Sequence, residues 1–198
     1  MSGLDGVARY HDINVRKVED RLSRILTCVA AGLASPFVRD YVTQLRTWGR
    51  CGPRNYRCMV PLGHYTIANL VQYTNDPPDR DVFKSLEVVR REAQKSGKGR
   101  GDCGTYTACL DTVFAIWGFD VGCDIFAQSP SWDHVAAKVR APGVGEILLD
   151  ASVRPLVPPA WEPPPTKYWL RRTYWFRNLG QWVEWWKRGA RNEDMPPI

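Results

Sequence analysis

Length, composition and charge set the first limits on this chain. Its 198 residues suffice for one domain of ordinary size, or for a domain with an extension. A hydrophobic content of 44% excludes wholesale disorder, and a formal charge of +6 is too modest to select nucleic acid, an anionic cell wall or an acidic protein as the partner.

The first residues and the cysteines bear on the compartment. Residues Met1 to Gly6 lack a basic and then apolar leader, so we expect no signal peptide and synthesis in the cytoplasm. In that reducing compartment the six cysteines are expected to be free thiols rather than three disulfides. The longest apolar run, around Ile25 to Leu33, is too short to cross a bilayer, so no membrane partner is expected.

The N-terminal region shows helical periodicity. Apolar residues from Val15 to Leu33 recur at three- and four-residue steps with charged residues on the other side, which predicts an amphipathic helix. Ser35 and Pro36 restart the pattern as N-cap and first helical residue, and a second apolar stripe runs to Trp48. The close succession of the two patterns predicts a helical hairpin.

Residues 49–65 contain several glycines and prolines and are expected to form a loop. Cys51, Cys58 and His64 lie in this loop and invite a metal site. Their spacing fits no tight zinc pattern, and a fourth ligand would have to come from a distant segment. We therefore expect no metal and no other cofactor.

Two further helical patterns precede a glycine-rich loop. A short helix around Ile67 stops at the turn 75–78, and an amphipathic stretch runs from Val82 to Lys95. The loop 96–101 that follows carries glycines and lysine but lacks the residue order of a P-loop. Nucleotide binding is therefore rejected.

The stretch 99–106, with sequence Gly-Arg-Gly-Asp-Cys-Gly-Thr-Tyr, places Cys103 between small residues where a helical pattern begins. The positive end of the helix dipole is expected to lower the pKa of a thiol in the first turn and to favour the thiolate. Asp102 is expected to cap the helix, although its charge would tend to raise the thiol pKa. The alternative is a buried structural cysteine.

Short stretches rich in Val, Ile and Leu follow at 119–126, 134–140 and 146–152 and predict strands. Helices followed by a short antiparallel sheet give an α+β fold, with the cysteine helix at its core. From Arg154 the chain becomes rich in proline and then in aromatic residues, and six of the nine tryptophans lie after residue 160. So much aromatic area needs cover from the domain or from a partner.

A nucleophilic cysteine needs a base and an orienting group, and His134 and Asp150 lie on the two predicted strands of one hairpin. Their midpoint is residue 142. A three-residue loop at 141–143 would set the two side chains directly opposite, and one at 142–144 would make them diagonal neighbours on the same face. An even loop centred there would place them on opposite faces.

The order of Cys, His and Asp on helix, strand and next strand resembles the transglutaminase-like branch of papain-fold cysteine hydrolases, in its compact bacterial or tailed-phage form. The resemblance is carried by residues 101–106, 134–135 and 149–152, with 71–76 as a helix-to-strand passage before them. It implies Cys103 as nucleophile, His134 as general base and then acid, and Asp150 as the group that holds the imidazole. The Cys103 backbone N–H would be one oxyanion donor.

The resemblance also implies a function and a division of the chain. Residues 1–64 would be an N-terminal helical region, 65–155 the catalytic core and 156–198 an extension. The function would be a thiol-dependent hydrolysis or transfer of an amide in a protein or a peptidoglycan peptide. The alternative is a phage structural or interaction protein that docks on virion proteins through the C-terminal extension. A nucleic-acid partner ranks last, because it rests on net charge and aromatic content alone.

Overall fold

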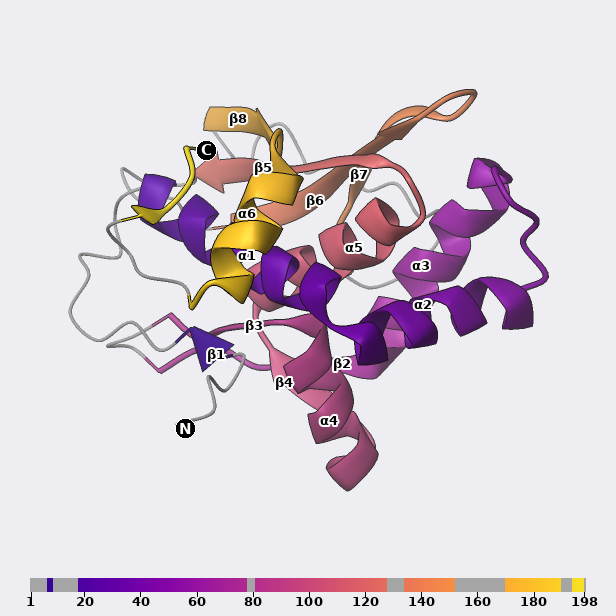
Figure 1. The fold of residues 1–198 in the computed structure, drawn as a ribbon, viewed down its shortest axis with the longest axis horizontal. Coiled ribbons are helices and arrows are strands. Elements are labelled where there is room, and N and C mark those ends of the chain that lie inside the picture. The colour runs from indigo at the N-terminus through magenta and orange to yellow at the C-terminus, as the bar shows by residue number, and fades with distance from the viewer. Residues whose placement is uncertain are drawn as a thin grey trace.

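The computed structural model describes residues 7–8, 18–77, 81–127, 134–151, 170–189 and 194–197 (Figure 1). Its helices are α1 (Val18–Ala34), α2 (Pro36–Trp48), α3 (Tyr56–Leu70), α4 (Leu86–Ser96), α5 (Cys103–Ile116) and α6 (Leu179–Lys187). Its strands are β1 (Val7–Ala8), β2 (Val71–Tyr73), β3 (Phe83–Lys84), β4 (Gly99–Gly101), β5 (Asp120–Ala127), β6 (His134–Ala141), β7 (Gly145–Leu149) and β8 (Leu170–Trp175). The predicted α+β class is confirmed.

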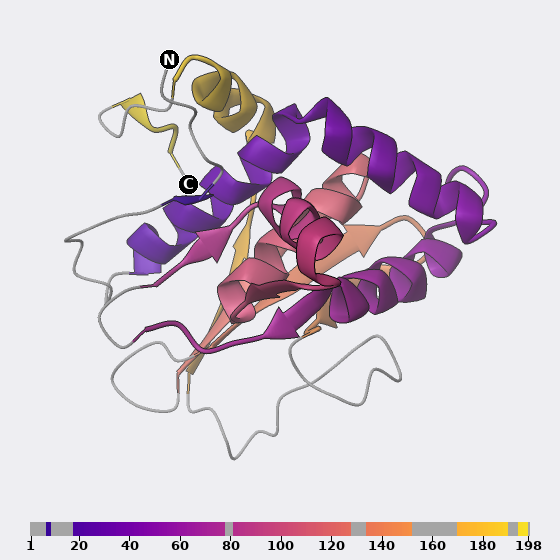
Figure 2. The same cartoon turned by 90° about the horizontal axis from the view of Figure 1, so that it is seen from below.

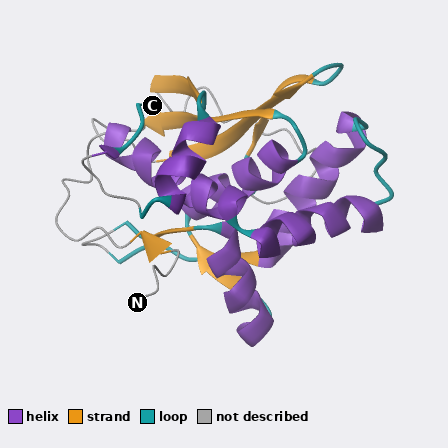
Figure 3. Ribbon diagram, in the orientation of Figure 1, coloured by secondary structure: helices purple, strands orange, loops and turns teal. Residues whose placement is uncertain are grey.

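The largest sheet has the strand order β7-β6-β5-β8, and every pair in it is antiparallel. Helix α5 packs against β5 and β6 on one face of this sheet, and α1 packs on the other side of α5 (Figures 1 and 3). The result is a layer of helices on one face of a sheet, with the cysteine helix between the two.

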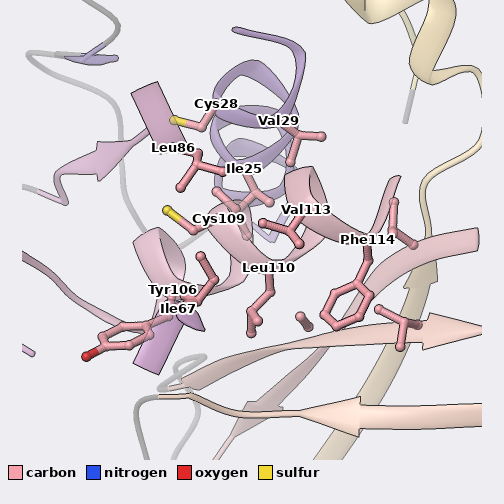
Figure 4. Packing of buried hydrophobic residues seen from close by; sticks show 14 of the residues in the cluster. Ile25, Cys28, Val29, Ile67, Leu86, Tyr106, Cys109, Leu110, Val113 and Phe114 are labelled. Carbon is pink, nitrogen blue, oxygen red and sulfur yellow. The ribbon is translucent and has the colours of Figure 1, made fainter. Parts of the chain in front are cut away.

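Helix α5 forms the centre of the hydrophobic core. Its residues from Gly104 to Phe114 are all buried. Ile25 and Val29 of α1 approach one side of it, while Leu110 and Phe114 point toward the strands (Figure 4). A helix buried on all sides reads as apolar around its whole circumference, which is why α5 shows little amphipathic pattern in the sequence.

Helices α1 and α2 confirm the predicted amphipathic segments but correct their arrangement. Ser35 has an extended backbone and its hydroxyl accepts a hydrogen bond from the Val38 amide, as an N-cap does. The two helices meet at 80° and do not form a hairpin. The reason is that α5 and α6 cover the apolar surface of α1, so α2 does not need to fold back over it.

Among the described residues, no single helix is long and apolar enough to cross a membrane, although α1 and α2 together pass by length and composition. Most of α1 is buried inside the protein, including Leu22, Ile25 and Val29. Arg24 and Thr27 of the same helix are buried too.

The expected loop at 49–65 is a helix over much of its length, because α3 begins at Tyr56 and continues through Pro61. Gly63, which suggested a loop, is required by packing. A Cβ atom there would lie 2.7 Å from the Phe114 ring. The chain then passes directly from α3 into β2, which is the helix-to-strand passage expected before the cysteine.

The cysteines correct a second expectation. Cys51 and Cys58 form a disulfide across the start of α3, with their Cα atoms 5.6 Å apart. Their sulfurs therefore bond to each other and are not ligands for a metal shared with His64. The described cysteines Cys28, Cys103, Cys109 and Cys123 are free thiols, and the first, third and fourth of these are buried.

The C-terminal segment supplies part of the main sheet and core over its described residues. Strand β8 pairs with β5, and Arg171 and Thr173 of β8 both donate hydrogen bonds to the buried carboxylate of Asp124. Helix α6 packs on α1 and buries Trp182 and Trp185. The domain itself thus covers these aromatic side chains.

Strands β2 and β4 form a separate parallel pair, with Val71 opposite Gly99 and Tyr73 opposite Gly101. The pair lies beside α4 and on the other side of the molecule from the four-stranded sheet (Figures 1 and 2). Strand β4 ends one residue before Asp102 and α5, so this small sheet positions the start of the cysteine helix.

Candidate active site

The start of α5 fixes the position of Cys103. Asp102 caps the helix as expected: it has an extended backbone, and its Oδ1 accepts a hydrogen bond of 3.0 Å from the Thr105 amide. Cys103 is the first helical residue, so its backbone N–H has no acceptor within the helix. The sequence resemblance implies that this N–H acts as an oxyanion donor.

The glycines on either side of Cys103 serve the packing of the protein itself. A Cβ atom on Gly101 would lie 2.4 Å from Cγ2 of Thr105, and one on Gly104 would lie 2.2 Å from Cε1 of Phe83. Both distances are far below van der Waals contact. The small residues therefore let β3 and the first turn of α5 close around Cys103.

The β6–β7 hairpin brings His134 and Asp150 together. Its strands pair Ala141 with Gly145 and Ala137 with Leu149, so the loop is 142–144 and has three residues. This is the odd loop that makes the two side chains diagonal neighbours. His134 Nε2 lies 2.5 Å from Asp150 Oδ2, and Asp150 is buried while His134 is partly exposed.

The peptide that joins His134 to Val135 contacts the thiol. Val135 and Cys103 line the same cavity, and the Val135 backbone N–H is near enough to the sulfur to lower its pKa. The Thr107 hydroxyl of α5 donates a hydrogen bond of 3.4 Å to the Val135 carbonyl. These two contacts hold the beginning of β6 against the first turns of α5. Residues 103, 134 and 150, which are far apart in the sequence, thus lie in one place.

The electrostatics of Cys103 differ from the sequence expectation. Burial is the main cause that raises the pKa of its thiol to about 12, and the charges of Asp102 and Asp150 add to it. The Val135 N–H and the Arg21 charge lower the pKa by less. Burial and the neighbouring carboxylates thus raise this pKa, opposite to the lowering expected from the helix dipole. The resting side chain of Cys103 is a thiol.

A cavity of about 200 Å³ opens beside the thiol. Its wall combines acidic, aromatic and apolar side chains from α1, from the segment after β2, from β3 and from the sheet. It is lined by Arg21, Ile25, Tyr73, Asn75, Asp76, Asp81, Phe83, Asp102, Cys103, Gly104, Ile125 and Val135. The nucleophile candidate is thus accessible from one side, while the ring of His134 lies against Phe126.

His64, a metal candidate in the sequence, lies behind Asp150. It is buried, and it lies close to the Asp150 backbone. Burial lowers the pKa of this imidazole, so it is neutral near pH 7. No spacing in the sequence relates His64 to Asp150, because 86 residues separate them. Among the described residues, no group of three or more His, Cys, Asp and Glu side chains could hold a metal ion.

Comparisons with known proteins add little to this geometry. No family model matches the chain, and no curated protein sequence matches it. A solved structure from Parabacteroides distasonis, described as a "putative protease", is similar with a TM-score of 0.43 and 12% identity. The match covers 67% of this chain and spans 27% of that one. A similarity of this size does not identify the function of this chain.

Proposed function

We propose that this protein is a thiol-dependent hydrolase or acyltransferase that cleaves or exchanges an amide bond, with Cys103 as nucleophile, His134 as general base and Asp150 as orienting group. The observation that carries the proposal is the contact between the His134–Val135 peptide and the Cys103 sulfur, with Asp150 bonded to His134 from the other side. Nucleophile, base and orienting group are the three parts that covalent acyl transfer requires.

The protonation state of Cys103 determines the first step of the proposed reaction. Since burial and carboxylates keep Cys103 protonated, the imidazole must take the thiol proton as the sulfur attacks the amide carbon. In this proposal Nδ1 of His134 accepts the proton, while Asp150 Oδ2 lies 2.5 Å from Nε2. Asp150 then stabilises the imidazolium that forms.

The remaining steps are the formation and breakdown of the tetrahedral intermediate and of the thioester. The attack creates a tetrahedral intermediate. Its oxyanion accepts a hydrogen bond from the Cys103 backbone N–H, at the positive end of α5. His134 returns the proton to the leaving amine, the C–N bond breaks and a thioester remains on Cys103. Water, or a second amine in an acyl transfer, attacks the thioester with His134 again as base. The C–S bond then breaks, the acyl product leaves, and His134 returns the proton to the Cys103 sulfur.

Substitutions at the three positions test the proposal. Cys103→Ala, His134→Ala and Asp150→Asn are each expected to lower the release of amines from a panel of protein and peptidoglycan substrates by at least about a hundredfold. Cys109→Ala is the matched control, because Cys109 is a free and fully buried thiol on the same helix. Retained turnover in Cys103→Ala would refute the role of the thiol, provided that circular dichroism shows an unchanged fold.

The alternative function, docking through a C-terminal arm, has less support than the chemistry. Residues 170–189 pack into the sheet and against α1, so they are not an arm. The proline-rich stretch that motivated this alternative, residues 155–165, lies outside the described residues. An association with virions remains a prediction from the resemblance alone.

A further inference from the structure

The cavity beside Cys103 has an unequal distribution of charge. Its described lining contains the carboxylates of Asp76, Asp81 and Asp102 and one guanidinium, that of Arg21. Arg21 Nε lies 3.5 Å from Asp81 Oδ2, so these two charges offset each other. Asp76 and Asp102 are the acidic groups that remain next to the thiol.

The backbone holds these two carboxyl groups in place. Asp76 Oδ2 accepts a hydrogen bond of 2.6 Å from the Val82 amide, and Asp102 Oδ1 accepts one of 3.0 Å from the Thr105 amide. Both side chains line the cavity that contains Cys103. The fold therefore holds two acidic groups side by side next to the thiol.

Burial and mutual repulsion both disfavour two negative charges on this pair. Burial is the larger cause that raises the pKa of Asp102 to about 7, followed by the charge of Asp76. Burial is also the main cause that raises the pKa of Asp76, while its bond to the Val82 amide and the nearby Lys84 lower it. A positive charge that entered the cavity would stabilise the doubly ionised pair.

The same charge would act on the nucleophile. Asp102 directly precedes Cys103, and its negative charge disfavours the thiolate. A cation bound between the carboxylates and the thiol would offset this effect and favour ionisation of the sulfur. The site would then be activated by the substrate that it binds.

We propose that Asp76 and Asp102 are specificity-determining residues, which bind an ammonium or guanidinium group of the substrate next to the amide that Cys103 attacks. The proposal rests on the proposed function and names the class of substrate: a peptide or amide with a cationic group beside the scissile bond. The cavity of about 200 Å³ has the volume of several water molecules, which suits one extended side chain. Tyr73 lines the same cavity and is 46% exposed, and its ring stacks on that of Tyr106 with the centroids 6.3 Å apart.

Thiol reagents of different charge test the proposal without knowledge of the substrate. The probes are the 2-aminoethyl, 2-hydroxyethyl and 2-sulfonatoethyl methanethiosulfonates, which carry positive, zero and negative charge. Rates of modification of Cys103 in the full chain are measured by mass spectrometry, and each is divided by the rate with a simple thiol. We expect the cationic reagent to react about tenfold faster than the anionic one, or more, since a charge a few ångströms away changes such equilibria by one to three decades.

Variants of the pair locate the source of this preference. Asp76→Asn removes the charge and retains an acceptor for the Val82 amide, so the ratio of cationic to anionic rates is expected to fall several-fold toward one. Asp40→Asn, an exposed carboxylate on α2, is the matched control and should leave the ratio unchanged. If Asp76→Asn fails to fold, salt gives the same information, because raising the ionic strength to about 1 M screens charges beyond about 3 Å and should lower the wild-type ratio.

The outcomes separate this proposal from the proposed function. A wild-type ratio near one, or a ratio that Asp76→Asn leaves unchanged, overturns cation recognition and does not affect the catalytic proposal. A His134→Ala variant that loses turnover but retains the charge preference supports both. Turnover that survives in Cys103→Ala removes the catalytic proposal, whatever the charge preference.

Discussion

The buried carboxyl group of Asp111 leads to the most quantitative prediction. Asp111 lies in the middle of α5 and is fully buried, and neither of its side-chain oxygens has a hydrogen-bond partner among the described residues. Burial alone raises its pKa well above the ordinary value. In the unfolded chain the same carboxyl group is hydrated and ionises near pH 4.

The sign of the effect follows from proton binding. Above about pH 4 the folded protein retains a proton on Asp111 that the unfolded chain has lost, so this residue makes the protein less stable as pH rises. The loss is about 1.4 kcal/mol for each pH unit until the folded carboxyl group ionises. Asp111→Asn cannot ionise and should escape this loss.

Urea denaturation of the wild type and of Asp111→Asn, followed by tryptophan fluorescence, measures the effect. Between about pH 4.5 and 6.5 the variant should gain about 3 kcal/mol relative to the wild type. In a chain of this length that gain corresponds to a rise in Tm of roughly 6–12 °C. Asp40→Asn is the exposed control and should show no such trend. An unfolding free energy whose pH dependence is the same in Asp111→Asn and wild type would refute the reasoning.

Two further predictions concern the first turns of α5 and α3. Gly104→Ala should lower the unfolding free energy by about 1–3 kcal/mol, because its Cβ would lie 2.2 Å from the Phe83 ring. Gly52→Ala is the control and should have little effect, since a Cβ there would have nothing within 4 Å. Equal effects of the two substitutions on the urea midpoint would contradict the packing argument. Reduction of the Cys51–Cys58 disulfide should lower the unfolding free energy by about 2 kcal/mol, since the closed loop is short. A Cys51→Ala/Cys58→Ala variant that unfolds at the same temperature as the oxidised protein in calorimetry would show that the bond contributes nothing.

Some features of the candidate site could be predicted from local residue patterns. Helix α5 starts where the small residues and Asp102 indicated, because an N-cap is a local interaction between residues three apart. His134 and Asp150 share a face because side chains alternate along strands and the loop 142–144 is odd. Both features depend on the nearest neighbours in the chain or in one hairpin.

Other features of the site depend on contacts between distant segments. Asp76 lies on the same cavity wall as Asp102, and His64 lies close to Asp150, although no motif links these residues. The disulfide between Cys51 and Cys58 also depends on how the loop after α2 turns into α3. Sequence spacing alone does not give the distance between two cysteines in space.

The residue pattern was enough to predict the class of fold, the helix that carries Cys103 and the hairpin that carries His134 and Asp150. These follow from hydrophobic periodicity, capping residues and turn length, all of which act over short range. The tertiary structure decided the protonation of the thiol, the acidic wall of the cavity and the 80° angle between α1 and α2. Burial and charge at a site depend on which segments the fold brings together, so the dipole of one helix did not predict the pKa of Cys103.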